Sequence, residues 1–204
     1  MTKTINLSLY DERVKEFFSA NEKALSEYKK LFNMYNKTHN ISRLKNIDDE
    51  IKDSILPYFL LEDDGVCLKN INAIDVGSGA GFAGLFLAMI DSSLNMSLCE
   101  LSSKKASFLT LVKIYLGLSN VKVINDDVSK LDTKYDLISS RAMSKTYDII
   151  NLCKNSIQEN TMFLFYKGSN VYEESEFLKT KVVYNYGFRN YLFFKKSDLN
   201  MEKL

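Results

Sequence analysis

Residues 71–84 read Ile71-Asn-Ala-Ile-Asp-Val-Gly-Ser-Gly-Ala-Gly-Phe-Ala-Gly84, a short apolar run followed by closely spaced glycines. The apolar start of this stretch is typical of a buried strand, and the apolar run of residues 82–90 after the glycines predicts a helix. A glycine turn between a strand and a helix exposes backbone N–H groups, to which a ligand can come close. The same glycines also serve close packing of a helix on a strand, so the turn alone leaves both interpretations open.

The rest of the chain repeats this alternation. Apolar or alternating runs predict four further strands, at residues 94–100, 121–124, 135–139 and 161–166. Apolar residues at helical spacing predict helices over 106–116, closed by Gly117, and over 146–154. Residues 182–186 and 191–194 read as two strands joined by a short turn. We therefore expect an α/β fold, with a mostly parallel twisted sheet, helices on both faces and a terminal antiparallel hairpin.

The first 60 residues follow a helical pattern instead. Apolar residues recur three and four positions apart, for example Val14, Phe17 and Phe18, which places them on one stripe. Asp48 and Asp49 stand where an N-cap belongs, and Pro57 is expected to disturb or end the short helix that follows. We expect two or three helices here, so that residues 1–60 form a helical cap packed on a ligand-binding domain of residues 61–204.

Composition excludes several classes of protein. The chain has 204 residues, 46% of them hydrophobic, with a net charge of +1, which suits one compact unit. Its longest apolar run falls far short of the about 20 residues that cross a bilayer. Cys67, Cys99, Cys153 and the single His39 lack the spacing of a metal site, so no metal is expected. We expect buried thiols in a cytoplasmic protein without a secretion signal.

Charge is unevenly spread along the chain. Residues 1–47 have a balance of +4, residues 48–164 of −5 and residues 165–204 of +2. Basic ends around an acidic middle fit a rim that contacts phosphates, and they equally fit ordinary solvated helix faces. Charge alone leaves this choice open.

Acidic residues follow the next two strands. Glu100 stands 19 positions after Gly81, at the end of its strand, where a carboxylate accepts both hydroxyls of a ribose. Asp126 and Asp127 follow the third strand, where they can meet an adenine edge. Together with the glycine turn, these residues predict a nucleoside pocket at the carboxyl edge of the sheet.

Two nucleoside cofactors compete for this pocket. Gly79, Gly81 and Gly84 satisfy the dinucleotide fingerprint, so NAD(P) is a serious alternative. However, Asp75 lies just inside the turn, where its charge would repel a pyrophosphate and suit the cationic groups of S-adenosylmethionine. Only about 120 residues follow the motif, which leaves little room for a second mononucleotide half and a catalytic domain. The residues therefore favour S-adenosylmethionine.

Six motifs follow one another along the chain. They are Tyr35-Asn-Lys-Thr-His-Asn-Ile-Ser42, Asp53-Ser54, Asp75-Val-Gly-Ser-Gly-Ala-Gly-Phe-Ala-Gly84, Glu100-Leu-Ser-Ser-Lys-Lys-Ala-Ser-Phe-Leu109, Ser140-Arg141-Ala142 and Tyr166-Lys167-Gly168. In this order they resemble the signatures of the glucose-inhibited division protein B family, bacterial methyltransferases that act on N7 of a guanine in small-subunit rRNA. The resemblance covers roughly residues 25–195.

The resemblance implies a Rossmann-like class I methyltransferase that uses S-adenosylmethionine on one guanine of 16S rRNA near the decoding centre. By position, it implies cofactor contacts from Gly77, Phe82, Glu100, Asp126, Asp127 and Arg141. The reasoning from the turn adds Asp75 and Gly79 to these cofactor-binding residues. Arg141 is also expected beside the substrate, and a surface arginine is the alternative. Expected partners are 16S rRNA or the small ribosomal subunit, with no membrane, and we expect a monomer.

Three positions depart from the family pattern. Glu50 stands where the family usually has a histidine, Tyr35 where a tryptophan is common, and Asn125 where an arginine is usual. An acidic Glu50 facing RNA would be unfavourable, so we expect no direct phosphate contact from its segment. The cofactor contacts are expected to remain.

The chemistry that the resemblance implies needs no proton acceptor. Guanine N7 carries a lone pair and no proton, so direct in-line attack on a methyl group requires no general base, and positioning must supply the rate. Arg141 and Lys167 are the candidate catalytic residues, Lys167 as a contact to substrate phosphate. Phe82, Tyr166 and Tyr172 are candidates to stack on a base, and Phe82 alternatively packs beneath the helix. The remaining alternatives are a small NAD(P)-binding protein and a non-catalytic RNA-binding protein of methyltransferase fold.

Overall fold

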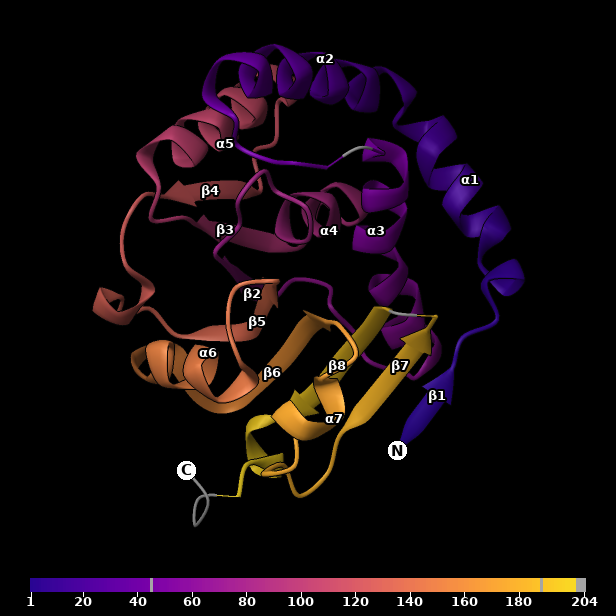
Figure 1. The fold of residues 1–204 in the computed structure, drawn as a ribbon, viewed down its shortest axis with the longest axis vertical. Helices are drawn as coiled ribbons and strands as arrows, with labels where there is room; N and C mark the ends of the chain where they lie inside the picture. The colour runs from indigo at the N-terminus through magenta and orange to yellow at the C-terminus, as the bar shows by residue number, and fades with distance from the viewer. Residues whose placement is uncertain (45, 188, 201–204) are drawn as a thin grey trace.

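A computed structural model of the chain describes residues 1–44, 46–187 and 189–200, which form one layered α/β unit (Figure 1). Its eight-stranded sheet has the order β1-β7-β8-β6-β5-β2-β3-β4. The strands are β1 (Thr2–Thr4), β2 (Asn72–Val76), β3 (Asn95–Cys99), β4 (Val121–Ile124), β5 (Tyr135–Arg141), β6 (Ile157–Lys167), β7 (Val182–Tyr186) and β8 (Arg189–Lys195).

All neighbouring pairs in this sheet are parallel except those that β8 makes with β6 and with β7. The mostly parallel sheet and its terminal antiparallel hairpin are thus confirmed. Strand β1 was not predicted, because three residues are too short to show an alternating pattern. It extends the sheet by pairing with β7.

Helices cover both faces of the sheet, as predicted. One face carries α1 (Asp11–Ala20), α2 (Glu22–His39), α3 (Ile47–Asp63), α4 (Gly84–Ile90) and α5 (Ser103–Leu116), and the other carries α6 (Thr146–Leu152) and α7 (Val171–Glu174). Short 3-10 turns complete the chain, η1 (Leu7–Leu9), η2 (Val128–Lys130), η3 (Lys154–Ser156) and η4 (Lys196–Asp198). Alternate strand residues, such as Leu137 and Ile138, face the two separate cores because successive side chains point to opposite faces.

The prediction for α3 was wrong at both ends. Asn46 caps the helix, since its side-chain oxygen accepts the N–H groups of Asp48 and Asp49 at 3.1 and 3.3 Å. The helix continues through Pro57 to Asp63. Every residue from Ile51 to Leu61 except Lys52 is buried, and this burial outweighs the hydrogen bond that proline removes.

The N-terminal helices share a core with the sheet domain. Tyr28 of α2 is fully buried, stacks edge-on against Phe86 with ring centroids 5.0 Å apart, and donates its hydroxyl to the Ala80 carbonyl at 2.7 Å. In Figure 1, α2 lies beside α5 and α3 beside α4. The division into residues 1–60 and 61–204 stays a prediction, and its boundary falls inside α3.

The cysteines differ in exposure. Cys99 and Cys153 are buried, whereas Cys67 is exposed, so the expectation of three buried thiols was wrong for Cys67. That residue lies in the loop between α3 and β2, which offers little cover. Within the described ranges, no helix is both long and apolar enough to span a bilayer.

Candidate functional site

The glycine turn lies at the carboxyl end of β2, between β3 and β5, where the chain leaves the centre of the sheet in both directions. This is the switch point at which open α/β sheets bind ligands. Gly79 has φ +60°, and a Cβ there would meet no atom nearer than 3.8 Å, so its backbone faces open space. A Cβ on Gly84 would lie 2.4 Å from the Cβ of Asp75. Both interpretations of the glycines hold, since Gly79 opens the main chain and Gly84 lets α4 pack on β2.

Glu100 ties this turn to the next strand. Its carboxylate accepts the N–H of Gly79 at 2.8 Å and the N–H of Ser102 at 2.8 Å. The side chain is thereby fixed at the end of β3 with acceptor capacity left on both oxygens. Asn125 reinforces the corner, because its amide donates to the Glu100 carbonyl at 2.9 Å. Asn125, which departs from the family pattern, therefore acts here as a loop brace.

The turn opens into a cavity of about 600 Å³, called here the first cavity. Its walls carry four of the predicted cofactor residues with acidic or aromatic side chains, Phe82, Glu100, Asp126 and Asp127, together with Gly77, Gly79 and Arg141. The remaining lining is mainly apolar and comes from Ile41, Leu44, Val76, Ala80, Cys99, Leu101, Val128, Ala142, Met143 and Leu152, with Ser42, Ser78 and Lys105.

This lining fits S-adenosylmethionine better than a dinucleotide. The three carboxylates outnumber the two cations of the lining, Lys105 and Arg141, so this cavity would repel a pyrophosphate and suits a cationic cofactor with a ribose. Hydrogen bonds from the Lys130 side chain and from the backbone N–H of Asp127 lower the pKa of Asp126. Hydrogen bonds from the backbone and side chain of Ser129 lower the pKa of Asp127. Both carboxyl groups therefore stay ionised at neutral pH. Apolar side chains such as Leu101 and Val128 offer surfaces for an adenine ring. Glu100 would hold the ribose, and the two aspartates the adenine end.

Asp75 occupies a different position from the other predicted acids. It is 1% exposed, lies beneath the turn and accepts the Ser139 hydroxyl at 2.8 Å. Burial raises its pKa to about 6 against the hydrogen bonds from Ser139, Ser78 and Gly84, which lower it. Asp75 is absent from the walls of the first cavity in the described structure. Its part in cofactor binding stays a prediction, and its position favours support of the turn.

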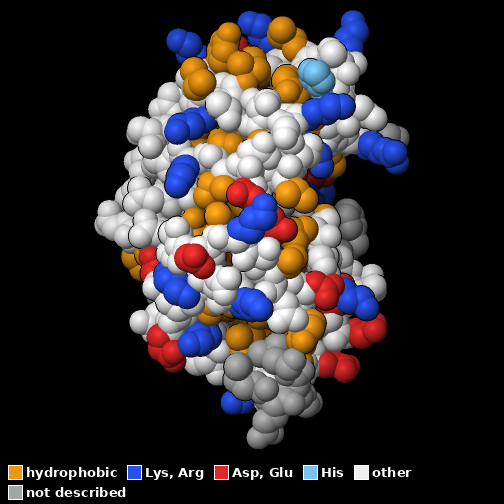
Figure 2. All heavy atoms as spheres, turned by 90° about the vertical axis from the view of Figure 1, so that its left-hand side faces the viewer, with side chains coloured by type: hydrophobic (Ala, Val, Ile, Leu, Met, Phe, Trp, Pro, Cys, Tyr) orange, Lys and Arg blue, Asp and Glu red, His pale blue; other side chains and the backbone are white. Residues whose placement is uncertain are grey.

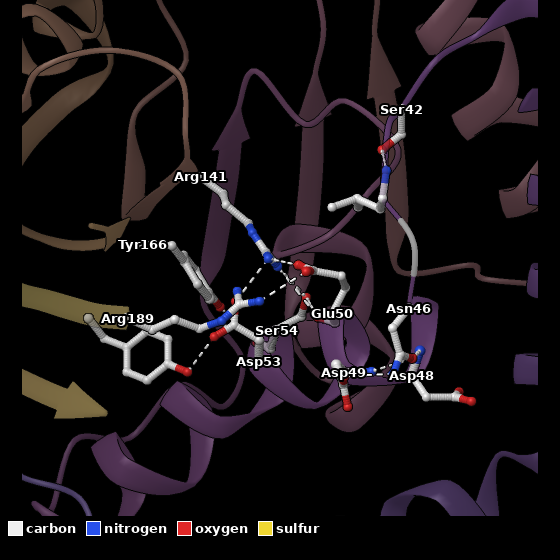
Figure 3. A network of polar contacts seen from close by, with 12 residues as sticks. Ser42, Asn46, Asp48, Asp49, Glu50, Asp53, Ser54, Arg141, Tyr166 and Arg189 are labelled. Carbon is white, nitrogen blue, oxygen red and sulfur yellow. Dashed lines mark hydrogen bonds and ion pairs between the residues drawn. The ribbon is translucent and has the colours of Figure 1, made fainter. Parts of the chain in front are cut away.

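Arg141, the last residue of β5, belongs to a cluster of four charges (Figure 3). Its guanidinium contacts the carboxylate of Glu50 and lies 2.9 Å from that of Asp53. Arg189 at the start of β8 also contacts Asp53 and bonds Glu50 at 2.9 Å. Tyr191 donates its hydroxyl to Asp53 at 2.6 Å. We call Glu50, Asp53, Arg141 and Arg189 the charge cluster.

The charge cluster is largely buried and balanced. Its side chains are between 6% and 24% exposed, and two cations face two anions. Burial raises the pKa of Asp53, while the Tyr191 hydrogen bond and Arg189 lower it. Burial also lowers the pKa of Arg141 to about 10, which leaves it ionised at neutral pH. The cluster therefore fixes Arg141 between α3 and the sheet, and the alternative of a surface arginine is wrong.

Sequence reasoning missed this cluster, although Glu50 was singled out as a departure. Instead of facing RNA, Glu50 points inward and neutralises both arginines. The spacing of Glu50 and Asp53 on one face of α3 was a usable signal, because residues three apart are neighbours on a helix. Arg189, by contrast, is 139 positions from Glu50.

Lys167 lines a second cavity of about 490 Å³, beside the first. Its ammonium group donates to Glu174 and to the Ser144 carbonyl, both at 2.7 Å, and its side chain is only 8% exposed. The two cavities share Arg141, Ala142 and Met143 as a common wall. A direct contact of Lys167 with substrate phosphate stays a prediction, and its neutralisation by Glu174 favours a different role.

The three aromatic residues expected to stack on a base differ in their exposure to solvent. Phe82 is 6% exposed and packs against Tyr28 and Phe86, which supports the packing alternative. Tyr166 is also 6% exposed and donates its hydroxyl to the Ser54 carbonyl at 2.7 Å. Tyr172 is exposed. Of these three candidates, only Tyr172 therefore presents a broad face to solvent.

The segment that follows Tyr35 contributes Ile41 and Ser42 to the lining of the first cavity. Tyr35 donates its hydroxyl to the Lys104 carbonyl at 3.0 Å, and its ring centroid is 4.3 Å from that of His39.

Figure 2 shows a face of the molecule on which Lys and Arg side chains are spread among hydrophobic ones in the upper part. Among the described residues, no group of three His, Cys, Asp or Glu side chains is placed to hold a metal ion.

The fold and the first cavity define a class I S-adenosylmethionine-dependent methyltransferase. Solved structures of this fold match the chain. A 16S rRNA N2 G1207 methyltransferase from Thermus thermophilus, bound to AdoMet and guanosine, aligns with a TM-score of 0.58 and 16% identity over 70% of this chain and 42% of its own. An O-methyltransferase from Thermotoga maritima gives 0.55 and 16% over 71% and 64%. At this identity these likenesses show the fold alone.

Sequence comparison identifies the family. The family model for rRNA small subunit methyltransferase G, GidB, matches residues 21–201. Ribosomal RNA small subunit methyltransferase G of Campylobacter jejuni strain RM1221 is 38% identical over 85% of this chain and 91% of its own length, and that of Campylobacter fetus is 39% identical over 84% and 92%. The chain belongs to the rRNA small subunit methyltransferase G family. The predicted resemblance is confirmed, and the nicotinamide alternative is disfavoured.

Proposed function

We propose that this protein transfers a methyl group from S-adenosylmethionine to N7 of one guanine of 16S rRNA near the decoding centre. The observation that carries the proposal is the pair of cavities that meet at Arg141 in a chain of this family. One cavity has the charges and the walls for the cofactor. The other is large enough for a base that has been turned out of its RNA stack.

The reaction requires that the guanine be positioned, and it requires no proton transfer. S-adenosylmethionine, when bound, supplies a methyl group on a sulfonium. The N7 lone pair of guanine forms a bond to that carbon while the carbon–sulfur bond breaks, and no proton moves. The protein's part is therefore to align the base with the first cavity, to exclude water and to offer no net positive charge near N7.

Arg141 is suited to this positioning role. It lies in the wall that both cavities share, and the charge cluster holds its guanidinium from α3 and β8. Its two acidic partners cancel much of its charge, which would otherwise repel a guanine that becomes cationic. Lys167 is neutralised in the same way by Glu174.

The partner and setting follow from this function. The substrate is 16S rRNA or the small ribosomal subunit, and the exposed basic side chains of the face in Figure 2 are available to its phosphates. We place the protein in the cytoplasm, where ribosomal subunits are found and free thiols are stable. We propose that residues 1–60 form a helical cap. We also propose that the protein is a monomer, and light scattering of the purified protein tests this oligomeric state.

The direct test is transfer of a labelled methyl group from S-adenosylmethionine to 16S rRNA and to small subunits that lack the modification. N7-methylguanine is then mapped by chemical strand scission. One scission site near the decoding centre is expected. If neither substrate takes up label while S-adenosylhomocysteine still raises the melting temperature, the cofactor assignment stands and the substrate assignment fails.

A further inference from the structure

The second cavity has a feature that the transfer of a methyl group does not by itself require. Its lining includes a donor and an acceptor in direct contact, the ammonium of Lys167 and the carboxylate of Glu174, 2.7 Å apart. The two side chains are 8% and 21% exposed. A surface pair of this kind contributes little, whereas a pair that lines a cavity is placed to meet a ligand.

The orientation of this pair is fixed by its surroundings. Lys167 also donates to the Ser144 carbonyl at 2.7 Å, and Thr146 lies 3.5 Å from the same oxygen of Glu174. Within the described residues, these bonds engage two of the three N–H groups of Lys167 and only Oε2 of Glu174. One N–H of Lys167 and Oε1 of Glu174 therefore remain for a ligand.

We propose that Lys167 and Glu174 select guanine as the base to be methylated, with the ammonium donating to O6 and the carboxylate accepting N1–H. This inference rests on the proposed function. On guanine, the O6 acceptor and the N1–H donor are adjacent, which matches an adjacent donor and acceptor. Adenine presents the reverse pattern, an amino donor at position 6 and an acceptor at N1, and would leave both charged groups facing the wrong partner.

The pairing also places N7 and charge correctly. O6 lies between N1 and N7 on the purine, so a base held by O6 and N1 keeps N7 free. Arg141 is part of the same cavity and borders the first, which gives N7 a route toward the cofactor. Because the pair is neutral as a whole, its ammonium does not act as an isolated cation beside the N7-methylguanine product.

The test changes single groups on the base. Small subunits are reconstituted with 16S rRNA that carries guanosine, inosine or 2-aminopurine at the target position, and single-turnover transfer of labelled methyl is measured. Inosine keeps O6 and N1–H and lacks only the 2-amino group, so its rate should stay within about threefold of guanosine. 2-Aminopurine lacks O6 and N1–H, and its rate should fall by at least about 100-fold, because two hydrogen bonds to charged groups are lost.

Variants then assign the effect to the pair. Glu174→Ala should slow transfer to guanosine by about 30-fold and reduce the preference over 2-aminopurine to about fivefold, since a hydrogen bond to a charged group is lost. Glu174→Gln, which keeps an acceptor, should fall between. Glu159→Ala is the matched control, because it breaks a Lys–Glu pair of the same 2.7 Å length on the surface. Affinity for S-adenosylhomocysteine should be unchanged throughout.

The outcomes separate the two proposals. Equal rates for guanosine and 2-aminopurine in the unmodified protein, or an undiminished preference in Glu174→Ala, overturn the selection of guanine and leave the proposed function intact. Failure of the unmodified protein to methylate subunits that carry guanosine overturns the proposed function and this inference with it.

Discussion

Along one edge of the sheet, the first cavity and the second cavity handle charge in opposite ways. The first presents three carboxylates, Glu100, Asp126 and Asp127, against two cations, Lys105 and Arg141, among apolar walls. In the second, each carboxylate contacts a cation: Glu174 contacts Lys167, and Asp53 contacts Arg141 and Arg189. An excess of negative charge suits a cationic cofactor, and balanced pairs suit a neutral base that becomes cationic. Under the proposed function, affinity for the cofactor and alignment of the base thus depend on separate sets of side chains.

The largest expected effect comes from unbalancing the charge cluster. Glu50→Ala leaves Arg141 and Arg189 with one carboxylate between them, largely buried, and should lower the free energy of unfolding by about 3–5 kcal/mol. Urea unfolding at pH 7.5 measures this. Glu50→Gln, which keeps hydrogen-bonding capacity, should lose less, and Glu159→Ala at an exposed pair should match the unmodified protein. A loss in Glu50→Ala no larger than in Glu159→Ala would show that the cluster does not hold α3.

A second prediction contrasts two buried carboxyl groups. Asp75 is buried away from cations, whereas Asp53 contacts Arg141 and Arg189 in the charge cluster. Burial raises the pKa of Asp75 in the folded protein to about 6 from an ordinary value of 3.8. The folded state then binds the proton more tightly than the unfolded state, so stability falls as pH rises from about 4 to about 6, by at most about 3 kcal/mol.

Asp75→Asn removes this titration. The difference in free energy of unfolding between Asp75→Asn and the unmodified protein should therefore shift in favour of the variant between pH 4.5 and pH 7.5. Urea titrations at both values measure it. A difference that is independent of pH would mean that the carboxyl keeps an ordinary pKa.

A third prediction concerns the anchor of the first cavity. Glu100→Ala removes the acceptor of the Gly79 and Ser102 N–H groups and the proposed ribose contact. Affinity for S-adenosylhomocysteine should fall by about 30-fold, because hydrogen bonds to a carboxylate are lost. Isothermal titration calorimetry measures it. An unchanged dissociation constant would place the ribose elsewhere.

The smallest effect is expected at the rim of the same cavity. Asp126 is solvated and already bonds Lys130 at 2.9 Å. Asp126→Ala should therefore lower the affinity for S-adenosylhomocysteine by less than about fivefold. The same titration applies. A loss as large as that of Glu100→Ala would show that the adenine end carries as much binding energy as the ribose.

The sequence predicted features that depend on local pattern. The strand of residues 121–124 has its predicted bounds, and the glycine turn lies where the apolar strand ends, because strand period and glycine conformation are local properties. The helix through Pro57 was missed because tertiary burial overrode a local breaker. The four-residue extension of β6 before residue 161 was missed because Ile157-Gln-Glu-Asn lacks an apolar run.

The site divides in the same way. Glu100, Asp126 and Asp127 could be placed because each follows a predicted strand, and parallel strands bring their carboxyl ends together. The charge cluster could not be assembled, since Glu50, Arg141 and Arg189 come from segments that only the tertiary fold brings together. The pairing of Lys167 with Glu174 needed the short helix α7, whose four residues carry no helical period.

A structure of the protein with S-adenosylhomocysteine on the small ribosomal subunit, by electron cryomicroscopy, tests the division between the two cavities most directly. We predict the adenosyl group in the first cavity with its ribose on Glu100, and the target guanine in the second with O6 on Lys167 and N7 toward Arg141. A guanine bound outside the second cavity, or an adenosyl group away from Glu100, would contradict this division of roles.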